Sequence, residues 1–327
     1  MQLSLNLIFV ATIVASEALA LATSGNAAAS GVELSANIKR HHKKRTCKAK
    51  SSKKTSSRIA TSSSGSSSGS VSSSITGHKK LGLSWTYGNY MDINLFDNKA
   101  GWRYNWKESD NTKSNLPYFP MLWNDDGSRV AAWQKNVVNN PSSVTSKTIM
   151  APNEPDVSSQ ANMSPEAVCS LMRKQMLPLK KNHGFKIIGP AVVNLEGDWY
   201  PRFVKACPDV QKEIDADAVH LYDSLASTSI SRLQKWHSTY KRPIYITEVA
   251  CHSFYITSKA PQCTGSGMAN SFYSGLTKFV ANSDYMAGIA PFGVFKANLP
   301  DGVGNFNRLS TTSGTPTNLW NMITSLI

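Results

Sequence analysis

Short apolar runs alternate with amphipathic stretches along residues 79–327. Compact apolar runs indicate buried strands, and apolar positions that repeat at intervals of three and four indicate helices. On this basis we predict eight strands, at 81–87, 103–106, 118–123, 148–152, 186–192, 218–222, 243–249 and 286–295. Helices are predicted between most of them, at 129–139, 164–182, 200–206, 229–240, 269–282 and 316–326. Helix 164–182 has the clearest start, because Ser164 is suited to cap it and Pro165 and Glu166 suit its first turn.

This alternation predicts an α/β fold of the (β/α)8 TIM barrel class. Eight strands in the 247 residues of 81–327 match such a barrel in number and length. The interval 88–118 shows no convincing helix between the second and third predicted strands. An open doubly wound sheet is the alternative, but no Gly-x-Gly-x-x-Gly turn follows the first strand. We therefore expect residues 79–327 to form a barrel domain.

The first 22 residues have the pattern of a secretory signal peptide. An apolar run at 3–15 is followed by small residues in an Ala-x-Ala arrangement. No Lys or Arg precedes the run, and an uncleaved membrane anchor is the alternative. No later segment approaches 18 consecutive apolar residues. We expect a protein that is secreted to the medium or the cell wall, with no membrane segment in its mature form.

Residues 23–78 are predicted to be a disordered arm that is basic first and rich in serine afterwards. Such a composition buries too little apolar surface to offset the entropy of ordering the chain. Three interpretations of the basic run remain open. It is a processed pro-segment, an electrostatic tether to acidic polymer in the cell wall, or a solvated linker.

The arm also accounts for most of the positive charge of the chain. Twelve of the 35 Lys and Arg lie in 34–80, where there is no Asp or Glu. Because two of the 21 acidic residues precede position 34, residues 81–327 carry 23 basic and 19 acidic residues, a net charge of +4. The high isoelectric point therefore does not indicate nucleic-acid binding by the folded part. Nucleic-acid binding by the arm is a separate hypothesis, which predicts salt-sensitive binding that requires residues 1–80.

Four of the five cysteines lie in the predicted barrel domain. An even number in an exported domain indicates disulfides. The separation of 12 residues favours a local bridge between Cys251 and Cys263, which leaves Cys169 to pair with Cys207. Cys47 stands alone in the arm. No Cys-x-x-Cys or Cys/His ligand spacing is present, and we expect no metal and no cofactor.

Two glutamates follow predicted strands in similar surroundings, Glu154 after "TIMAPN" and Glu248 after "PIYIT". They are 94 residues apart, which is three βα units at about 31 residues per unit. This separation assigns them to the fourth and seventh strands, whose carboxyl ends meet at the active-site face of a barrel. Two carboxylates that face each other across such a site are the equipment for glycoside hydrolysis. A glutamate at a strand end is otherwise a salt-bridge partner or a helix-capping acceptor.

Several motifs together resemble the alkali-sensitive linkage protein-like catalytic domain of fungi, glycoside hydrolase family 128. They are "WTYGN" (85–89), "PMLWN" (120–124), "NEPD" (153–156), "SQANMSPEA" (159–167), "GPAV" (189–192) and "ITEVAC" (246–251). The resemblance covers 81–327 and implies hydrolysis of β-1,3-glucan with retention. It implies that Glu154 is the acid/base, that Glu248 is the nucleophile and that Asn153 holds the neighbouring sugar hydroxyl.

Further residues are candidates for substrate contact because sugar rings stack on aromatic side chains. The tryptophans near ends of predicted strands are Trp85, Trp106, Trp123 and Trp199. Large aromatics are equally common in cores, and the helical Trp133, Trp236 and Trp320 are expected to pack there. His220 and Tyr222 share the inward parity of "AVHLYD", and Asn124 is a polar candidate. His220 is expected to orient Glu248 or bind a hydroxyl, and Tyr222 to hydrogen-bond the nucleophile; a core histidine bonded to backbone is the alternative.

The patterns predict a secreted glycoside hydrolase, which we expect to be a monomer, and the resemblance implies that it cleaves β-1,3-glucan of the fungal wall. One alternative is a glucan-binding wall protein of low catalytic activity, attached through its arm. Another is a glycosidase for a different β-linked polysaccharide. A serine hydrolase is disfavoured, because the only "GSSSG" match, at 65–69, lies in the low-complexity arm.

Overall fold

A computed structural model describes residues 79–88, 90–254 and 261–327. The described residues belong to one compact unit of the chain. The predicted signal peptide at 1–22, the predicted arm at 23–78 and Cys47 lie outside them. Among the described helices, none combines the length and the apolar character needed to cross a membrane.

Two parallel sheets form the centre of this unit. The larger sheet has five strands in sequence order, β3 to β7, and the smaller one pairs β1 with β2. Their bounds are β1 Gly82–Ser84, β2 Trp102–Tyr104, β3 Thr148–Met150, β4 Lys186–Val192, β5 Ala216–Asp223, β6 Ile244–Cys251 and β7 Met286–Pro291. Seven of the eight predicted strands are therefore present, several of them shorter than predicted.

The predicted strand 118–123 is absent as a strand. Two isolated parallel bridges take its place, Arg103 with Tyr118 and Met121 with Met150. Pro117 and Pro120 interrupt the ladder because proline has no amide hydrogen to donate. A third bridge joins Leu81, next to β1, to Ile289 of β7. The two sheets are thus connected on both sides.

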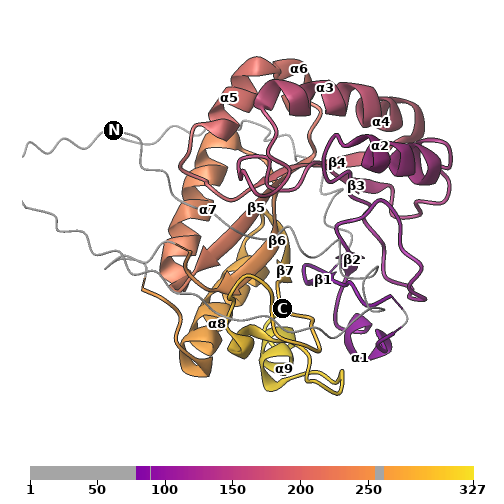
Figure 1. Ribbon diagram of the computed structural model, residues 1–327. Helices are drawn as coiled ribbons and strands as arrows, with labels where there is room; N and C mark the ends of the chain where they lie inside the picture. The colour runs from indigo at the N-terminus through magenta and orange to yellow at the C-terminus, as the bar shows by residue number, and fades with distance from the viewer. Residues whose placement is uncertain (1–78, 89, 255–260) are drawn as a thin grey trace, which may run out of the picture. The chain divides into compact units, whose positions relative to one another are not determined.

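Helices lie on the outer side of the strands (Figure 1). They are α1 Asn94–Asp97, α2 Gly127–Trp133, α3 Pro165–Gln175, α4 Leu177–His183, α5 Trp199–Ala206, α6 Pro208–Gln211, α7 Ala226–Tyr240, α8 Ser266–Asn282 and α9 Asn318–Thr324. A π-helical turn, Gln134–Val138, extends α2, and a 3₁₀ turn spans Asn305–Asn307. As predicted, the Ser164 hydroxyl caps α3 by accepting the Ala167 amide at 3.2 Å. The single helix predicted at 164–182 is two helices, because Pro178 cannot continue the hydrogen bonds of α3.

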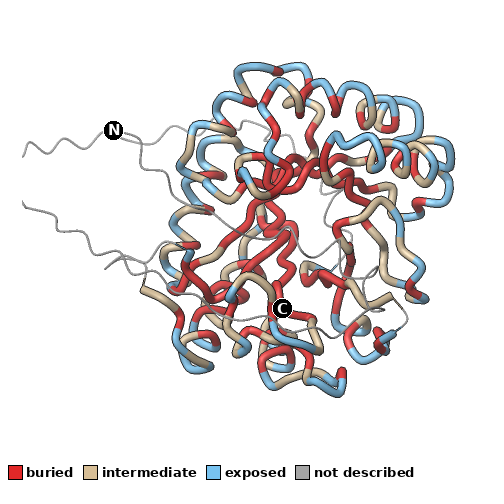
Figure 2. The backbone as a smooth tube through the Cα atoms, viewed as in Figure 1, coloured by how far each residue is buried: buried red, intermediate tan, exposed pale blue. Residues whose placement is uncertain are grey.

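Both faces of the larger sheet are buried, and the strands form the red centre of Figure 2. The outer face packs against the helices. The inner face packs against a smaller cluster in which the aromatic rings of Trp102, Phe119 and Tyr245 meet small residues of β5 and β7. Gly288 makes this possible, because a Cβ there would lie 2.6 Å from the Tyr245 ring. Aromatic rings, and not helices, therefore cover the inner face.

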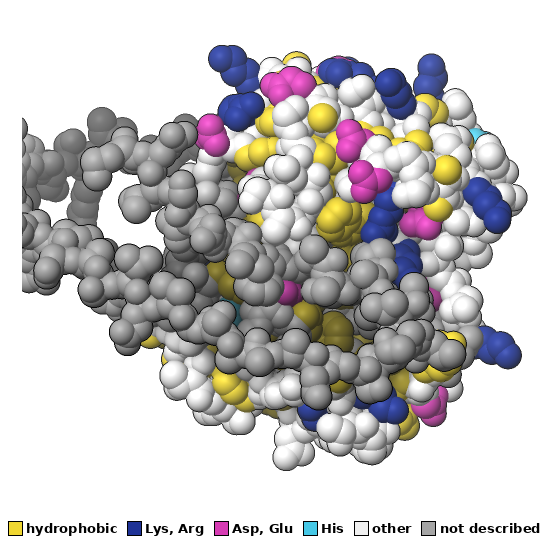
Figure 3. Space-filling view, in the orientation of Figure 1, with side chains coloured by type: hydrophobic (Ala, Val, Ile, Leu, Met, Phe, Trp, Pro, Cys, Tyr) yellow, Lys and Arg dark blue, Asp and Glu magenta, His cyan; other side chains and the backbone are white. Residues whose placement is uncertain are grey.

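The structure contains both predicted disulfides, Cys169–Cys207 and Cys251–Cys263. The first joins α3 to the residue that ends α5. The second joins the last residue of β6 to Cys263, three residues before α8. On the face shown in Figure 3, Lys and Arg lie along the outer edge with Asp and Glu between them. That distribution agrees with the low net charge of 81–327.

Candidate active site

Glu154 lies in the segment that follows β3, where its backbone is held beside β4. The Glu154 amide donates to the Ala191 carbonyl at 2.8 Å, and Asn153 forms a parallel bridge with Ala191. Glu154 has a left-handed backbone with φ of +46°. Its side chain is buried, with 5% of the residue exposed. The carboxyl group is thus fixed by β4 and does not move with a free loop.

Glu248 lies within β6, and both of its carboxylate oxygens accept hydrogen bonds. Trp106 Nε1 donates to Oε1 at 2.6 Å, and the Tyr222 hydroxyl donates to Oε2 at 2.6 Å. Trp106 follows β2, whereas Tyr222 belongs to β5. Donors from two sides orient this carboxylate and stabilise its charged form.

His220 connects the two glutamates. Its Nδ1 lies 2.6 Å from Glu154 Oε1 and 3.5 Å from Glu248 Oε2, and its Nε2 lies 3.0 Å from Thr247 Oγ1. The strand register places His220 directly opposite Glu248. One oxygen of each glutamate lies within 4.8 Å of the other. The structure therefore brings the two predicted carboxylates together around one buried imidazole.

The same three residues have the composition of a metal site, because a His and two Glu are an ordinary ligand set. The 2.6 Å between His220 Nδ1 and Glu154 Oε1 is a hydrogen-bond distance. Ligand atoms around a tetrahedral ion stand farther apart, at about 3 Å or more, given metal–ligand distances near 2 Å. The donors on Glu248 also occupy both of its oxygens. The arrangement is that of a hydrogen-bonded cluster and does not fit a resident metal.

Burial raises the pKa of both glutamates. Burial, followed by the charges of Asp156 and Asp301, raises the pKa of Glu154 to about 8. Burial also raises the pKa of Glu248, to about 7, while His220 and the two hydrogen-bond donors oppose the rise. Burial lowers the pKa of His220. Burial thus favours the protonated form of Glu154, which a general acid requires.

Asn153 has a buried side-chain oxygen, Oδ1, that accepts no hydrogen bond from the described residues. The residue is only 1% exposed and directly precedes Glu154. An unsatisfied buried acceptor costs free energy unless a ligand or water supplies a donor. A hydroxyl group of a bound molecule would satisfy it.

Three of the four tryptophans that we predict to contact sugar are linked to the site by hydrogen bonds or lie near it. Trp106 belongs to the site, as a hydrogen-bond donor to Glu248. Trp123 is half-buried near the site, since its carbonyl accepts the Asn153 amide. Trp199, on α5, is half-buried; it stacks on Phe203 and donates from Nε1 to the carbonyl of Met163, in the segment that leads from Glu154 to α3.

Two other residues that we predict to contact substrate, Trp85 and Asn124, are buried. Trp85 is fully buried and packs against Phe96, which gives it a core role in place of the sugar contact that we predicted. Asn124 is buried and makes two hydrogen bonds to Asp126 just before α2. Its amide therefore shapes the start of this helix, whereas we had predicted a contact with substrate.

Two further residues of the site were not predicted. Thr247 bonds to Nε2 of His220, and the Tyr104 hydroxyl donates to the Thr247 carbonyl at 2.5 Å. Tyr104 also packs against the Trp106 ring, with centroids 4.8 Å apart. The sequence contains a signal for each of them. Thr247 is next to Glu248, and Tyr104 lies two residues before Trp106, on the same side of an extended chain.

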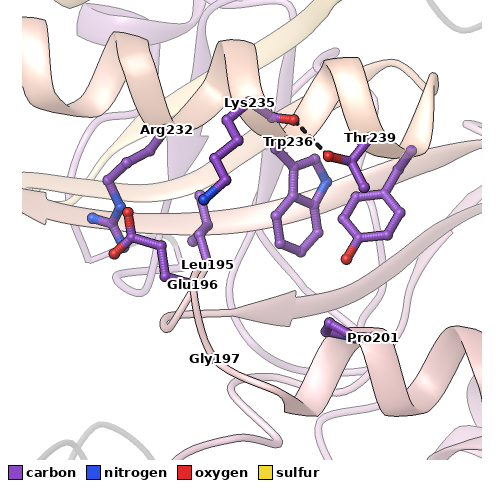
Figure 4. Close-up of a pocket in the computed structure, with 9 residues that line it drawn as sticks. Leu195, Glu196, Gly197, Pro201, Arg232, Lys235, Trp236 and Thr239 are labelled. Carbon is purple, nitrogen blue, oxygen red and sulfur yellow. Dashed lines mark hydrogen bonds between the residues drawn. The ribbon is translucent and has the colours of Figure 1, made fainter. Parts of the chain in front are cut away.

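A separate pocket of about 200 Å³ lies between α7 and the segment that follows β4 (Figure 4). Trp236, Tyr240 and Arg232 are among its lining residues, and none of the predicted site residues is. The Trp236 indole donates inward to Asp217, which also pairs with Arg242. This agrees with the packing role predicted for Trp236.

Comparison with known proteins gives a consistent picture. The family model described as glycosyl hydrolase catalytic core matches residues 82–322. Alkali-sensitive linkage protein 1 of Schizosaccharomyces pombe is 29% identical over 252 residues, which are 74% of this chain and 43% of that protein. This chain therefore spans less than half the length of that relative.

Two solved structures of glycoside hydrolase family 128 have a similar fold. An exo-β-1,3-glucanase of subgroup VI from Aureobasidium namibiae is 22% identical, with a TM-score of 0.61 over 77% of this chain and 97% of that chain. An oligosaccharide-binding protein of subgroup VII from Trichoderma gamsii is 17% identical, with a TM-score of 0.61 over 77% of this chain and 95% of that chain. At these identities the likeness concerns the fold.

Proposed function

This chain belongs to the family described as glycosyl hydrolase catalytic core, and we propose that it is a member of glycoside hydrolase family 128 that hydrolyses β-1,3-glucan with retention of configuration. One observation carries the proposal: Glu154 and Glu248 present oxygens within 4.8 Å of each other around His220. Retaining glycosidases hold their two carboxyl groups roughly 5–5.5 Å apart, whereas inverting enzymes leave roughly 6.5–9.5 Å for a water. The short separation supports retention.

The proposed reaction has two steps. Protonated Glu154 donates its proton to the glycosidic oxygen while Glu248 attacks the anomeric carbon, so that the leaving sugar departs and a glycosyl ester forms. Glu154, now ionised, takes a proton from water as the water oxygen attacks the same carbon and releases Glu248. The raised pKa of Glu154 supports its role as the acid, and the hydrogen bonds that Glu248 accepts support its role as the carboxylate.

Neighbouring groups have roles in this scheme. Asn153 accepts a hydrogen bond from the sugar hydroxyl next to the reacting carbon, which would satisfy its unpaired Oδ1. His220 orients the Glu154 carboxyl through the bond of 2.6 Å. Trp106 and Tyr222 orient Glu248 and favour its charged form against the effect of burial. Trp123 and Trp199, both half-buried, remain candidates for sugar stacking.

We further propose that the strands close into a (β/α)8 barrel with segment 118–121 in the position of the missing strand. The bridges from Arg103 to Tyr118, from Met121 to Met150 and from Leu81 to Ile289 support this closure. Residues 79–327 would then be the catalytic domain.

Relatives described as β-1,3-glucanases support β-1,3-glucan as the substrate and partner. A signal peptide at 1–22, secretion to the medium or cell wall, attachment through an arm at 23–78 and a monomeric state complete the proposal.

The second candidate is a glucan-binding protein without appreciable activity. The oligosaccharide-binding protein from Trichoderma gamsii, which shares the fold, favours its consideration. A panel of laminarin, curdlan, β-1,4-glucan and mannan, with linkage analysis of the products, separates the alternatives. We expect release from the β-1,3-linked polymers; release from another polymer alone would identify a different substrate, and binding without release would support the binding protein.

The Tyr222→Phe variant tests how Glu248 is kept ionised. The hydroxyl of Tyr222 lowers the pKa of Glu248, so its removal raises that pKa. Because the nucleophile must be ionised, the acidic limb of the pH–rate profile moves to higher pH, and kcat falls about 10-fold or more, as expected for a lost bond to a charged group. Tyr273→Phe is the matched control, since the Tyr273 hydroxyl donates to the backbone of the same strand at Val249. A shift of the acidic limb in the control, or none in Tyr222→Phe, would contradict this role.

A further inference from the structure

The backbone of Glu154 adopts an unfavourable conformation. A φ of +46° lies in the left-handed region, which residues with a side chain adopt at an energetic cost. Pro155 follows, and the residue before a proline is restricted toward extended conformations. Strain of this kind persists only where the surroundings hold it, and it is common at functional sites.

Asp156 supplies the restraint two residues later. Its Oδ2 accepts the backbone amides of Val193 at 3.1 Å and Asn194 at 2.8 Å, and its Oδ1 lies 3.3 Å from the Val193 nitrogen. These amides follow β4 directly. The Glu154 amide bonds to Ala191 at the same end of that strand. The strained residue is therefore tied to β4 on both sides, by its own amide and by the Asp156 carboxylate.

We propose that Asp156 is a positioning residue for Glu154, holding the left-handed turn against β4 so that the acid meets His220 and the glycosidic oxygen. This inference rests on the proposed function of Glu154. Asp156 accepts hydrogen bonds from backbone amides, so it acts on the reaction by holding Glu154, and its charge also acts on His220.

The charge of Asp156 adds a second effect, which distinguishes positioning from mere loop stability. Burial has the largest effect in raising the pKa of Glu154, and the charge of Asp156 has the second largest. Other ionisable groups that face or influence Glu154 come from several elements. They are His220 and Tyr222 of β5, Glu248 of β6, Tyr104 of β2 and Asp301 after β7. All of these stay in place when Asp156 alone is changed.

The Asp156→Asn variant tests the inference, with Asp215→Asn as its matched control. Asp215 accepts the Ile187 amide at 2.8 Å, near the start of β4, and so makes a similar bond at the opposite end of the strand; it also pairs with Lys180 at 2.8 Å. We expect both variants to lose thermal stability. Only Asp156→Asn should lower kcat on laminarin, by about 10-fold or more, as misplacement of a reacting group does. Only Asp156→Asn should move the basic limb of the pH–rate profile to lower pH, by about half a unit or more.

If Asp156→Asn and Asp215→Asn have the same kcat and the same pH–rate profile, the inference is overturned. If Asp156→Asn does not fold, Asp156→Glu replaces it: the charge remains while the carboxylate is displaced by one methylene. In Asp156→Glu we expect kcat to fall, because the carboxylate is displaced. The basic limb of the pH–rate profile should keep its position, because the charge remains. An unchanged kcat would overturn the inference.

A measurement without catalysis separates this inference from the proposed function. The Glu154 carboxyl carbon is titrated by NMR in the wild type and in Asp156→Asn, and its signal is assigned with Glu154→Gln. We expect a lower midpoint in Asp156→Asn, and an equal midpoint would contradict the electrostatic part. If the wild type shows no hydrolytic activity, the proposed function is wrong. The NMR titration would still test whether Asp156 raises the pKa of Glu154.

Discussion

The Glu248→Gln variant is expected to lose hydrolysis of laminarin by about 10⁴-fold or more in kcat. Glutamine has nearly the same size and keeps an oxygen that can accept from Trp106 or Tyr222, so the site stays assembled. It offers no carboxylate to attack the anomeric carbon. The loss therefore reflects the missing nucleophile and not a collapsed site.

Two measurements accompany that experiment. Calorimetric titration with laminari-oligosaccharides should show binding retained in Glu248→Gln, because the contacts with bound sugar remain. Glu196→Gln, which changes an exposed glutamate after β4, is the matched control and should keep wild-type activity. Activity of Glu248→Gln equal to that of the control would refute the assignment of the nucleophile.

The Glu154→Gln variant is expected to distinguish substrates by their leaving groups. On laminarin, whose leaving sugar needs a proton, kcat should fall by about 10² to 10⁴-fold, the usual contribution of general acid catalysis. An aryl glucoside with an acidic phenol needs little protonation, so the first step should be largely spared. We would measure the decrease in kcat of Glu154→Gln on each substrate and compare the two. Similar decreases on laminarin and on the aryl glucoside would contradict the acid role.

The same variant predicts a change in pH dependence. Wild-type activity requires Glu154 protonated and Glu248 ionised, so it falls above the pKa of Glu154 and below that of Glu248. With the aryl substrate, Glu154→Gln should lose the basic limb and keep the acidic one. A basic limb that persists in this variant would assign it to another group.

Much of the site could be predicted from the sequence because its two glutamates follow buried apolar runs. The run before Glu154 and the strand around Glu248 are buried as their composition indicates. The separation of 94 residues correctly indicated that the chain would bring the pair together. His220 and Tyr222 were predictable for a similar reason, since alternate residues of a strand share a face.

Other features depend on contacts that no local pattern contains. Trp85 and Trp106 both stand near strand ends, yet one packs in the core and the other bonds to Glu248. Trp106 has a left-handed backbone, with φ of +59°, which an apolar pattern does not encode. Asp156 accepts two amides beyond β4, a contact between segments that are 37 and 38 residues apart in the sequence.

Segment 118–123 shows a limit of apolar periodicity. Its side chains are buried as in a strand, with Phe119 and Met121 in the inner cluster. Its backbone bonds alternate between different neighbours: Phe119 donates to Arg103, and Leu122 donates to Met150. The two prolines prevent a continuous ladder, so the burial was predictable and the hydrogen bonding was not.

The most direct test of the central claim is proton NMR of the wild type during its first minutes of action on laminarin. A retaining enzyme with Glu154 as acid and Glu248 as nucleophile releases the β-anomer first, and the α-anomer follows by mutarotation. We expect the β-anomeric signal to precede the α-anomeric signal. First release of the α-anomer would contradict the two-step mechanism, and no release of sugar would contradict the proposal that this chain is a β-1,3-glucanase.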